Sequence, residues 1–330
     1  MSAISTSTQQ PTIQQPTIQQ PASGPGLFRP TGDATALLPT GTTPPIKVIG
    51  TAAIRDTFDD LCIRQAIASR TAPGVTDLVL NPDAHCGYGA PVGCVMVSPT
   101  HIYPGPVGVD IKCSMSLLQL DLPAGAIDDR QVRREIISAI CQRTPTGAGK
   151  GQRNCKKSRR VNRTLGMQVV TEGASADVCR QLGIPVAWAD ACEDASHVGH
   201  DDTTEALRLR LDALLDTRAM NNFSDKMLQL GSYGGGNHFG ECEVVKIGDD
   251  QRAQTVAQTF GLQDDKVAFL SHCGSRGFGH VLASAQFKTL QQTFETWGTP
   301  LPSGDRQLVY APLGTPEANA YLDDMALGAN

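Results

Sequence analysis

Residues 230–241 read LGSYGGGNHFGE, and the rest of the chain is organised around this stretch. Four glycines precede Asn237 and His238, and Glu241 follows the histidine by three positions. Glycine allows positive φ angles and lets another group approach the backbone closely. The stretch therefore predicts a loop shaped around a bound ligand. A glycine-rich turn whose histidine is hydrogen-bonded in the core explains this stretch alone equally well.

Three further stretches favour the ligand site. They are Pro82-Asp83-Ala84-His85, Asp110-Ile111-Lys112-Cys113 and His272-Cys273-Gly274-Ser275-Arg276-Gly277. Each places polar side chains beside a glycine-rich turn, and loops of this kind at the end of strands commonly carry binding residues. Together with the first stretch they predict a site for a metal and a phosphate.

The candidate metal ligands are a carboxylate, a thiolate and two imidazoles, from Asp110, Cys113, His238 and His272. Histidine suits zinc or manganese, carboxylate favours manganese or magnesium, and a thiolate can bridge two divalent ions. Two adjacent metals polarise phosphoryl oxygens, and the planar fork of Arg276 fits a phosphate. The spacing predicts metal-dependent phosphoryl chemistry, although each residue type taken singly is also compatible with a structural role.

A site shared by Asp110 and Cys113 requires a particular backbone conformation between them. In an extended strand, alternate side chains point to opposite faces, so these two would diverge. They converge only if the segment turns or bulges between them.

Composition places the chain among globular proteins. The 330 residues are 40% hydrophobic and 18% charged, and the net charge of −5 argues against a generally basic surface that binds nucleic acid.

Ten cysteines include no CxxC pair, and the N-terminus is polar without the features of a signal peptide. No apolar run approaches the roughly 20 residues that span a bilayer. These features predict a soluble cytoplasmic protein with free thiols.

The chain divides into a tail and one folded domain. Residues 1–43 are rich in Gln, Pro and Thr and predict a disordered tail, and residues 44–330 predict the domain. The hydrophobic spacing predicts helices at residues 52–70, 128–141, 203–220, 280–297 and 321–330, and strands at residues 75–80, 94–97, 116–122, 242–247 and 267–270. Residues 248–250 resemble a hairpin turn.

Three other patterns in the sequence give weaker indications of function. Residues 144–151 lack the GxxxxGK[ST] spacing, so a P-loop is rejected. Six cations between Arg153 and Arg163 are compatible with either a solvated face or contacts to RNA phosphates. His197 and His200 are spaced to hold a metal on a helix, but Gly199 lies between them and a polar linker is favoured.

Five motifs in the same order resemble those of the RtcB-type RNA-splicing ligases. These motifs are residues 82–89, 108–113, 236–241, 272–277 and 310–317. The resemblance covers about residues 46–330. It implies an α+β fold specific to that family, with β-sheets flanked by helices, and not a Rossmann or P-loop domain.

The resemblance implies an enzyme that joins RNA ends bearing a 3′-phosphate or 2′,3′-cyclic phosphate to a 5′-hydroxyl. Such ligases use GTP and Mn²⁺, here two ions, and pass GMP from a histidine to the RNA end. By motif, Asp110, Cys113, His238 and His272 would be metal ligands. Asn237, His238, Phe239 and Glu241 would contact GTP, and Arg276 and His85 would contact RNA phosphate.

The family's guanylylated histidine and its remaining metal histidine belong to motifs that residues 1–330 do not contain. The nucleophile is therefore expected beyond Asn330, and the chain is expected to be C-terminally truncated or a degenerate homologue. Two other functions stay open: a non-catalytic RNA-binding or regulatory homologue, and a metal-dependent phosphoesterase. No membrane partner is expected.

Overall fold

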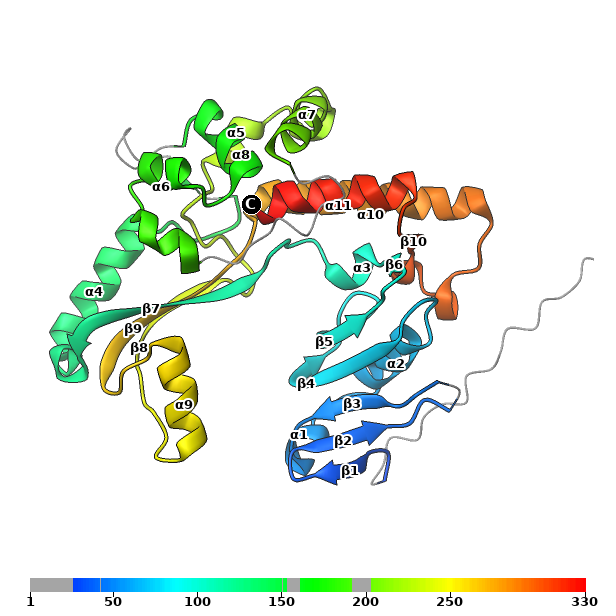
Figure 1. The fold of residues 1–330 in the computed structure, drawn as a ribbon, viewed down its shortest axis with the longest axis horizontal. Helices are drawn as coiled ribbons and strands as arrows, with labels where there is room; N and C mark the ends of the chain where they lie inside the picture. The colour runs from blue at the N-terminus through cyan, green and yellow to red at the C-terminus, as the bar shows by residue number, and fades with distance from the viewer. Residues whose placement is uncertain (1–25, 42, 150, 153–160, 192–202) are drawn as a thin grey trace, which may run out of the picture.

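The computed structural model describes residues 26–41, 43–149, 151–152, 161–191 and 203–330. Two separate sheets flank an open centre, and two long helices, α10 (Arg276–Trp297) and α11 (Pro316–Ala329), run across the top of them (Figure 1). Helices and sheets are therefore combined as the sequence predicted, and the α+β fold class is confirmed.

The first sheet has five strands in the order β1-β2-β3-β4-β5: β1 (Arg29–Gly32), β2 (Thr35–Leu38), β3 (Ile46–Ile49), β4 (Asp77–His85) and β5 (Val92–Val97). Only β3 and β4 are parallel, and the helices α1 (Ala52–Arg55) and α2 (Asp60–Arg70) connect them. Leu38, Ile46 and Leu80 are fully buried in this part of the molecule. The apolar face of the sheet and α2 therefore form one core.

The N-terminal boundary of the domain differs from the prediction. Strands β1 and β2 lie within residues 1–43, so the disordered tail does not extend to residue 43. Leu38 is fully buried, and β2 pairs antiparallel with β3 along its whole length. This short hairpin was missed because its strands have only four residues each, too few for a periodic pattern. Residues 1–25 lie outside the described residues.

The predicted helix over residues 52–70 is two helices with a break between them. The side chain of Asp59 accepts a hydrogen bond from the backbone N–H of Cys62 at 2.7 Å and starts α2. An aspartate in this position satisfies an N–H that has no partner within the helix. Phe58, in the break, packs edge to face against Phe28 at 6.1 Å.

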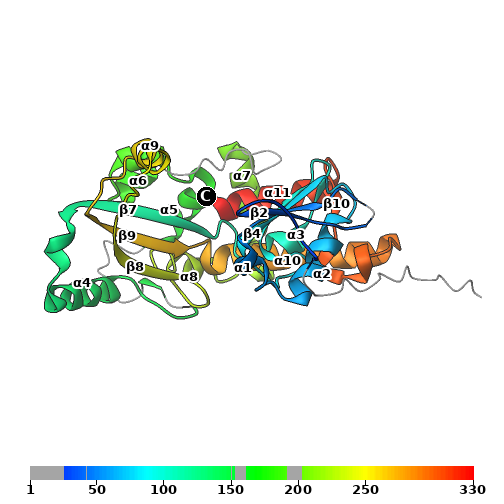
Figure 2. The same cartoon turned by 90° about the horizontal axis from the view of Figure 1, so that it is seen from below.

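The second sheet has three antiparallel strands in the order β7-β9-β8: β7 (Ser114–Pro123), β9 (Lys266–Cys273) and β8 (Phe239–Val244) (Figure 2). All three were predicted, but β8 begins earlier than expected, at Phe239. The turn expected at residues 248–250 instead begins the helix α9 (Gln251–Phe260), because the Asp250 side chain accepts from the N–H of Ala253 at 2.9 Å.

The remaining elements are mostly helical. They comprise α3 (Pro104–Val107), α4 (Arg130–Arg143), α5 (Arg163–Glu172), α6 (Ala176–Leu182), α7 (Thr204–Leu215) and α8 (Phe223–Met227), with short 3₁₀ turns at Ala124–Ile127, Val186–Ala191, Arg218–Met220, Pro302–Gly304 and Arg306–Leu308. A two-stranded pair joins β6 (His101–Ile102) to β10 (Ala311–Pro312).

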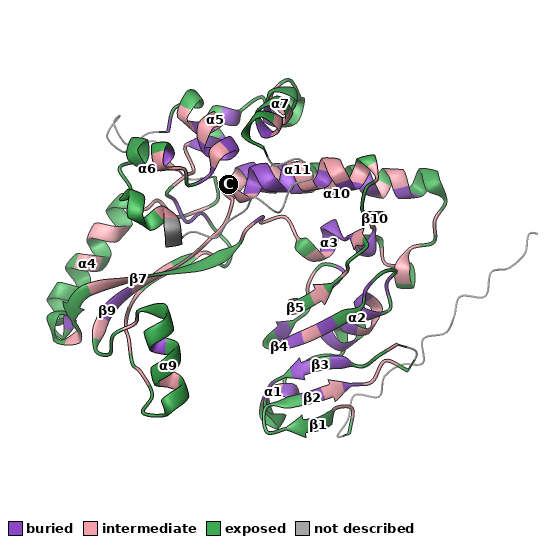
Figure 3. Ribbon diagram, in the orientation of Figure 1, coloured by how far each residue is buried: buried purple, intermediate pink, exposed green. Residues whose placement is uncertain are grey.

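The largest core lies around α10 and α11. Phe278, Leu282, Leu290 and Phe294 are buried at helical spacing on α10, and Leu327 of α11 is fully buried. Figure 3 shows that buried residues concentrate in these helices and in the first sheet, whereas in the second sheet β7 is largely exposed and β8 and β9 are mostly half-buried.

Two predicted features fall outside the described residues: most of the basic run between Arg153 and Arg163, and the pair His197 and His200. Among the residues that the structure describes, no helix is long and apolar enough to cross a membrane.

Candidate metal centre

A tight turn brings Asp110 and Cys113 together. The N–H of Cys113 donates to the carbonyl of Asp110 at 3.2 Å, and Lys112 between them has a φ of 53°. A positive φ is uncommon outside glycine, so the turn is held by the surrounding structure. The turn between Asp110 and Cys113 that a shared site requires is therefore confirmed.

The second sheet places the two histidines beside this turn. His238 lies immediately before β8, and His272 lies in β9 opposite both Phe239 of β8 and Met115 of β7. Because the strands are antiparallel, the start of β7, the start of β8 and the end of β9 meet at one end of the sheet. Residues 160 positions apart in sequence therefore come together there.

The four side chains form a mixed oxygen, sulfur and nitrogen donor set. Oδ2 of Asp110 lies 2.6 Å from Nε2 of His238. Sγ of Cys113 lies 2.9 Å from Nε2 of His272 and 3.8 Å from Nε2 of His238. One ligand atom each from Asp110, Cys113 and His238 lies within 4.8 Å of the other two, which is the geometry of a possible metal site.

The hydrogen bonds of His238 fix which ring nitrogen is free. Nδ1 lies 2.8 Å from the carbonyl oxygen of Tyr233 and 3.2 Å from Nη1 of Arg276. A carbonyl only accepts and a guanidinium only donates, so both contacts cannot be hydrogen bonds to the same tautomer. The shorter contact assigns the proton to Nδ1 and leaves the lone pair on Nε2, as in metal-ligating histidines.

This assignment provides a test of whether the residues fit a metal. With Nδ1 protonated, the neutral ring presents an acceptor, Nε2, to another acceptor, the carboxylate oxygen of Asp110, at 2.6 Å. Two acceptors at that distance require a positive charge between or beside them, either a proton or a cation. A borderline cation such as Mn²⁺ or Zn²⁺ satisfies this donor set of carboxylate, thiolate and imidazole.

Glycines clear the space around these ligands. A Cβ on Gly274 would lie 2.5 Å from Oδ1 of Asp110, so only glycine leaves the carboxylate in place. Gly234 has a φ of 80°, and a Cβ there would overlap the guanidinium of Arg276. The glycine-rich loop therefore lets the guanidinium of Arg276 approach its backbone closely, whereas the sequence predicted such an approach by a bound ligand.

The thiol of Cys113 is strongly affected by its surroundings. Burial, followed by the hydrogen bond and charge of Asp110, raises its pKa to about 12. Although the residue as a whole is solvent-accessible, the thiol itself is flanked by Asp110 and His272. A bound divalent cation reverses this effect, because it stabilises the thiolate directly.

Other predicted residues lie at different distances from the cluster. Phe239 packs edge to face against His272 with ring centroids 5.4 Å apart, whereas Asn237 and Glu241 are exposed. Arg276 begins α10, and its buried Nε has no hydrogen-bond partner among the described residues. His85 is the exception: it ends β4 on the other sheet, where its Nδ1 contacts the carbonyl of Asp83 at 2.7 Å.

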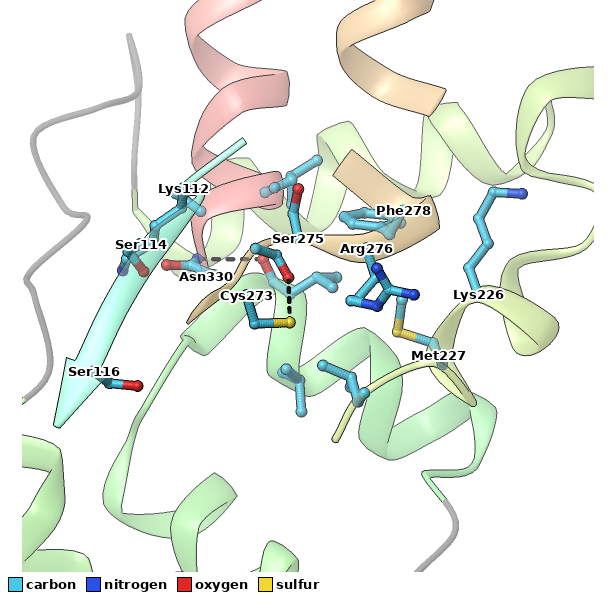
Figure 4. Close-up of a pocket in the computed structure, with 17 residues that line it drawn as sticks. Lys112, Ser114, Ser116, Lys226, Met227, Cys273, Ser275, Arg276, Phe278 and Asn330 are labelled. Atoms are coloured by element: carbon cyan, nitrogen blue, oxygen red, sulfur yellow. Dashed lines mark hydrogen bonds between the residues drawn. The ribbon is translucent and has the colours of Figure 1, made fainter. Parts of the chain in front are cut away.

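A cavity of about 240 Å³ is lined by residues next in sequence to the candidate ligands, among them Lys112 and Cys273 (Figure 4). Lys112 and Arg276 line opposite sides of it, with Cys273 and Ser275 between them, and Lys226 lies beyond Arg276. Three cationic side chains around one small cavity favour an anion such as phosphate. Of these three, only Arg276 was given a role from the sequence: Lys112 lies in a quoted motif but was assigned none, and Lys226 lies in no quoted motif.

Tyr233 and Gly274 are the other contributors that sequence reasoning missed. Tyr233 acts through its backbone carbonyl, which carries no residue-specific signal, and the role of Gly274 depends on Asp110, 164 positions earlier in the chain. The run of glycines around residue 234 was the one signal that pointed to close packing here.

Comparison with known proteins agrees with the family resemblance of the five sequence motifs. The family model described as tRNA-splicing ligase RtcB matches residues 65–330. A tRNA-splicing ligase RtcB of Archaeoglobus fulgidus is 31% identical over 274 residues, which are 81% of this chain and 51% of the relative. One of Pyrobaculum aerophilum is 31% identical over 305 residues, 89% of this chain and 57% of the relative.

An RNA-splicing ligase RtcB of Mycobacterium tuberculosis is 30% identical over 271 residues, which are 81% of this chain and 57% of the relative. The chain thus spans about half the length of the curated relatives that it matches.

Proposed function

Because the chain belongs to the RtcB family of tRNA-splicing ligases, we propose that it provides the metal- and phosphate-binding part of a GTP- and Mn²⁺-dependent RNA ligase. The reaction joins an RNA 3′-phosphate or 2′,3′-cyclic phosphate end to a 5′-hydroxyl end. The observation that carries this proposal is the cluster of Asp110, Cys113 and His238, with His272 at 2.9 Å from the sulfur.

In this proposal Asp110, Cys113, His238 and His272 would hold Mn²⁺. Bound Mn²⁺ would act as a Lewis acid toward phosphoryl oxygens and offset the charge of two anions brought together. The backbone carbonyl of Tyr233 keeps Nε2 of His238 available by accepting a hydrogen bond from Nδ1–H. Gly274 keeps the carboxylate of Asp110 beside the turn.

The phosphate contacts are assigned to the side chains around the cavity of Figure 4. Arg276 offers a planar pair of donors to an RNA phosphate, and its unpaired Nε supports that role. Asn237, His238, Phe239 and Glu241 are assigned to GTP, which would lie along the glycine-rich loop and the start of β8. His85 is assigned to RNA phosphate farther from the metal centre, since it lies on the first sheet.

The first test measures recognition of the RNA end. Two oligonucleotides that differ only in a 3′-phosphate or a 3′-hydroxyl are titrated against the full chain with Mn²⁺ or with EDTA. We expect Mn²⁺-dependent preference for the 3′-phosphate, and Asp110→Ala should abolish it. Arg276→Ala should weaken 3′-phosphate binding about 10- to 100-fold, as loss of charge-assisted hydrogen bonds worth about 1.5–3 kcal/mol predicts.

Arg130→Ala, an exposed arginine on α4, is the matched control and should leave the preference unchanged. Equal binding of the two oligonucleotides by the unaltered chain would contradict the proposal. Release of cyclic-phosphate ends without GTP would favour the phosphoesterase instead.

The second test concerns the nucleophile, which we assign to a histidine outside residues 1–330. Incubation of the chain with Mn²⁺ and GTP labelled at the α-phosphate should give no stable protein–GMP adduct. A labelled histidine among the seven in the chain would show this assignment to be wrong.

A further inference from the structure

Three cysteines from different elements lie around the packing of α2 on the first sheet. Cys62 of α2 is fully buried, and Cys94 of β5 is half-buried against the same core. Cys94 lies directly opposite Leu80 of β4, and opposite residues of an antiparallel pair share one face of the sheet. Because Leu80 is fully buried in the core that α2 covers, Cys94 faces α2 as well (Figure 1).

The third cysteine, Cys86, is exposed and lies in the turn that joins β4 to β5. Gln65 of α2 holds the next residue, Gly87: its side-chain amide accepts from the N–H of Gly87 at 2.9 Å and donates to the carbonyl at 2.7 Å. Gln65 lies three positions after Cys62, and residues three apart are neighbours on one side of a helix. These hydrogen bonds therefore hold the backbone beside Cys86 against the part of α2 that carries Cys62.

The electrostatics of Cys62 reflect this arrangement. Burial raises the pKa of its thiol to about 12, and Asp59, Cys94 and Cys86 each add to the shift. Both of the other thiols are therefore near enough to act on Cys62. Burial also raises the pKa of Cys94 to about 11, without a contribution from Cys86. Cys62 is thus the better-placed partner for Cys86.

A metal ion does not explain these three thiols. Among the described residues, the one group whose ligand atoms lie close enough together to share an ion is Asp110, Cys113 and His238. The thiols around α2 are spaced more widely, and burial keeps two of them protonated at neutral pH. An exposed thiol beside a buried one instead suits a two-step oxidation, in which the exposed sulfur reacts with a dissolved oxidant and the buried sulfur resolves the product.

We propose that Cys86 and Cys62 form a peroxide-responsive pair, which closes to a disulfide between α2 and the turn that follows β4. The thiolate of Cys86 attacks one oxygen of hydrogen peroxide, the O–O bond breaks, and the leaving hydroxide takes up a proton to become water. The sulfur of Cys62 then attacks the sulfur of the resulting sulfenic acid. The S–O bond breaks, and the hydroxyl leaves with the proton of Cys62 as a second water. Two thiols are oxidised and one peroxide is reduced.

The local backbone permits this closure. A disulfide joins residues whose Cα atoms lie about 4.4–6.8 Å apart. Cys86 lies outside the paired residues of β4 and β5, so its backbone can move toward α2 without breaking a hydrogen bond between the strands. Cys62 lies in the first turn of α2, where the side chain of Asp59 accepts from its N–H at 2.7 Å and holds it in place.

The test treats the reduced full chain with hydrogen peroxide and then blocks the remaining thiols with iodoacetamide. Mass spectrometry should find the peptides of Cys62 and Cys86 joined with the loss of two hydrogen atoms, and dithiothreitol should separate them. Because the folded chain holds these two thiols near one another, the joined form should exceed every other disulfide at least about tenfold. Neither thiol belongs to the proposed metal, nucleotide or phosphate contacts, so ligation activity is not needed for the test.

Three variants separate the two steps. Cys62→Ala removes the resolving thiol, so dimedone should label the sulfenic acid of Cys86 at least about tenfold more than in the unaltered chain. Cys86→Ser, a surface change, should give neither this label nor any disulfide of Cys62. Cys141→Ser removes another exposed thiol, on α4, and is the matched control that should leave the joined form unchanged. Far-ultraviolet circular dichroism checks that the variants fold.

Three results would overturn the inference. The first is a disulfide of Cys86 with Cys94, or the absence of any disulfide that includes Cys86. The second is a disulfide of Cys86 between two chains, recognised because it increases with protein concentration. The third is protection of all three thiols from iodoacetamide by Zn²⁺ and its reversal by EDTA, which would identify a metal site.

Discussion

At the scale of single residues, the proposed metal centre depends on backbone features as much as on the candidate ligands. Asp110 and Cys113 converge because Lys112 adopts a φ of 53°, and the carboxylate of Asp110 rests against Gly274. Ligands positioned by their neighbours lose affinity when a neighbour changes, even though no ligand is removed. Substitution of a residue that positions a ligand should therefore lower metal affinity measurably, as substitution of a ligand would.

Gly274→Ala should weaken metal binding without unfolding the protein. The new methyl group would lie 2.5 Å from Oδ1 of Asp110, so the carboxylate has to move. We expect affinity for Mn²⁺ to fall about 10- to 100-fold, the usual effect of disturbing residues that orient ligands. Isothermal titration calorimetry measures it. Gly125→Ala is the control, since a Cβ there meets its nearest atom at 3.7 Å, and an equal loss in both variants would refute the assigned role.

Metal affinity should rise with pH. Burial and Asp110 raise the pKa of the Cys113 thiol to about 12, so without metal it stays protonated at neutral pH. Metal binding must release that proton, and each released proton contributes up to about a tenfold gain in affinity per pH unit. Calorimetry between pH 6 and 8 in buffers of different ionisation enthalpy counts the protons. Cys113→Ser should release one fewer, whereas Cys86→Ser should match the unaltered chain.

The four metal-ligand candidates were predictable because each lies in a short motif with distinctive neighbours. The contribution of Tyr233 was not, because a backbone carbonyl leaves no mark in the sequence. Lys112 was quoted only as part of a motif, and nothing local indicated that it would face a cavity with Arg276. Contacts between residues far apart in the sequence depend on the register of β7, β8 and β9, which could not be read from the sequence.

At the scale of elements, sequence periodicity identified the longest strands and helices but not their limits, and it missed shorter ones such as β1, β2, α6 and α8. Helix capping accounts for two differences between the predicted and the observed elements. Asp59 starts a second helix within one predicted helix, and Asp250 begins a helix where a turn was expected. Both aspartates are compatible with either a turn or a helix start. The surrounding packing selects between them, and that information is not local.

An ion pair joins α7 to α11 beside their apolar contacts. Arg210 binds both oxygens of the buried Asp324, at 2.6 and 2.9 Å, and Gln286 also donates to that carboxylate. Arg210→Ala would leave a carboxylate that is 2% exposed without its counter-charge. We expect a loss of about 3 kcal/mol in the free energy of unfolding, measured with urea, in line with the cost of leaving a buried charge unpaired.

Arg180→Ala provides the comparison for that prediction. Arg180 pairs with Asp177 on the surface, where both side chains are more than half exposed, so its removal should cost less than about 1 kcal/mol. Equal losses in the two variants would mean that the pair between Arg210 and Asp324 has no special structural role.

At the scale of the whole molecule, the described part of the chain is an open arrangement in which two sheets are joined by helices. The metal centre lies where the second sheet meets this helical body, beside two cavities with different linings. The smaller cavity carries cationic side chains that suit a phosphate, whereas the larger one is lined mostly by apolar side chains. The two cavities adjoin, since Lys112 and Ser114 line both.

The central claim is that Asp110, Cys113, His238 and His272 hold a metal, and cobalt tests it most directly. Co²⁺ bound to a thiolate gives a charge-transfer absorption band in the near ultraviolet, so titration of the full chain reports sulfur ligation. We predict a saturable band for the unaltered chain and for Cys86→Ser, no band for Cys113→Ser, and a weaker one for His238→Ala. An undiminished band in Cys113→Ser would contradict the account.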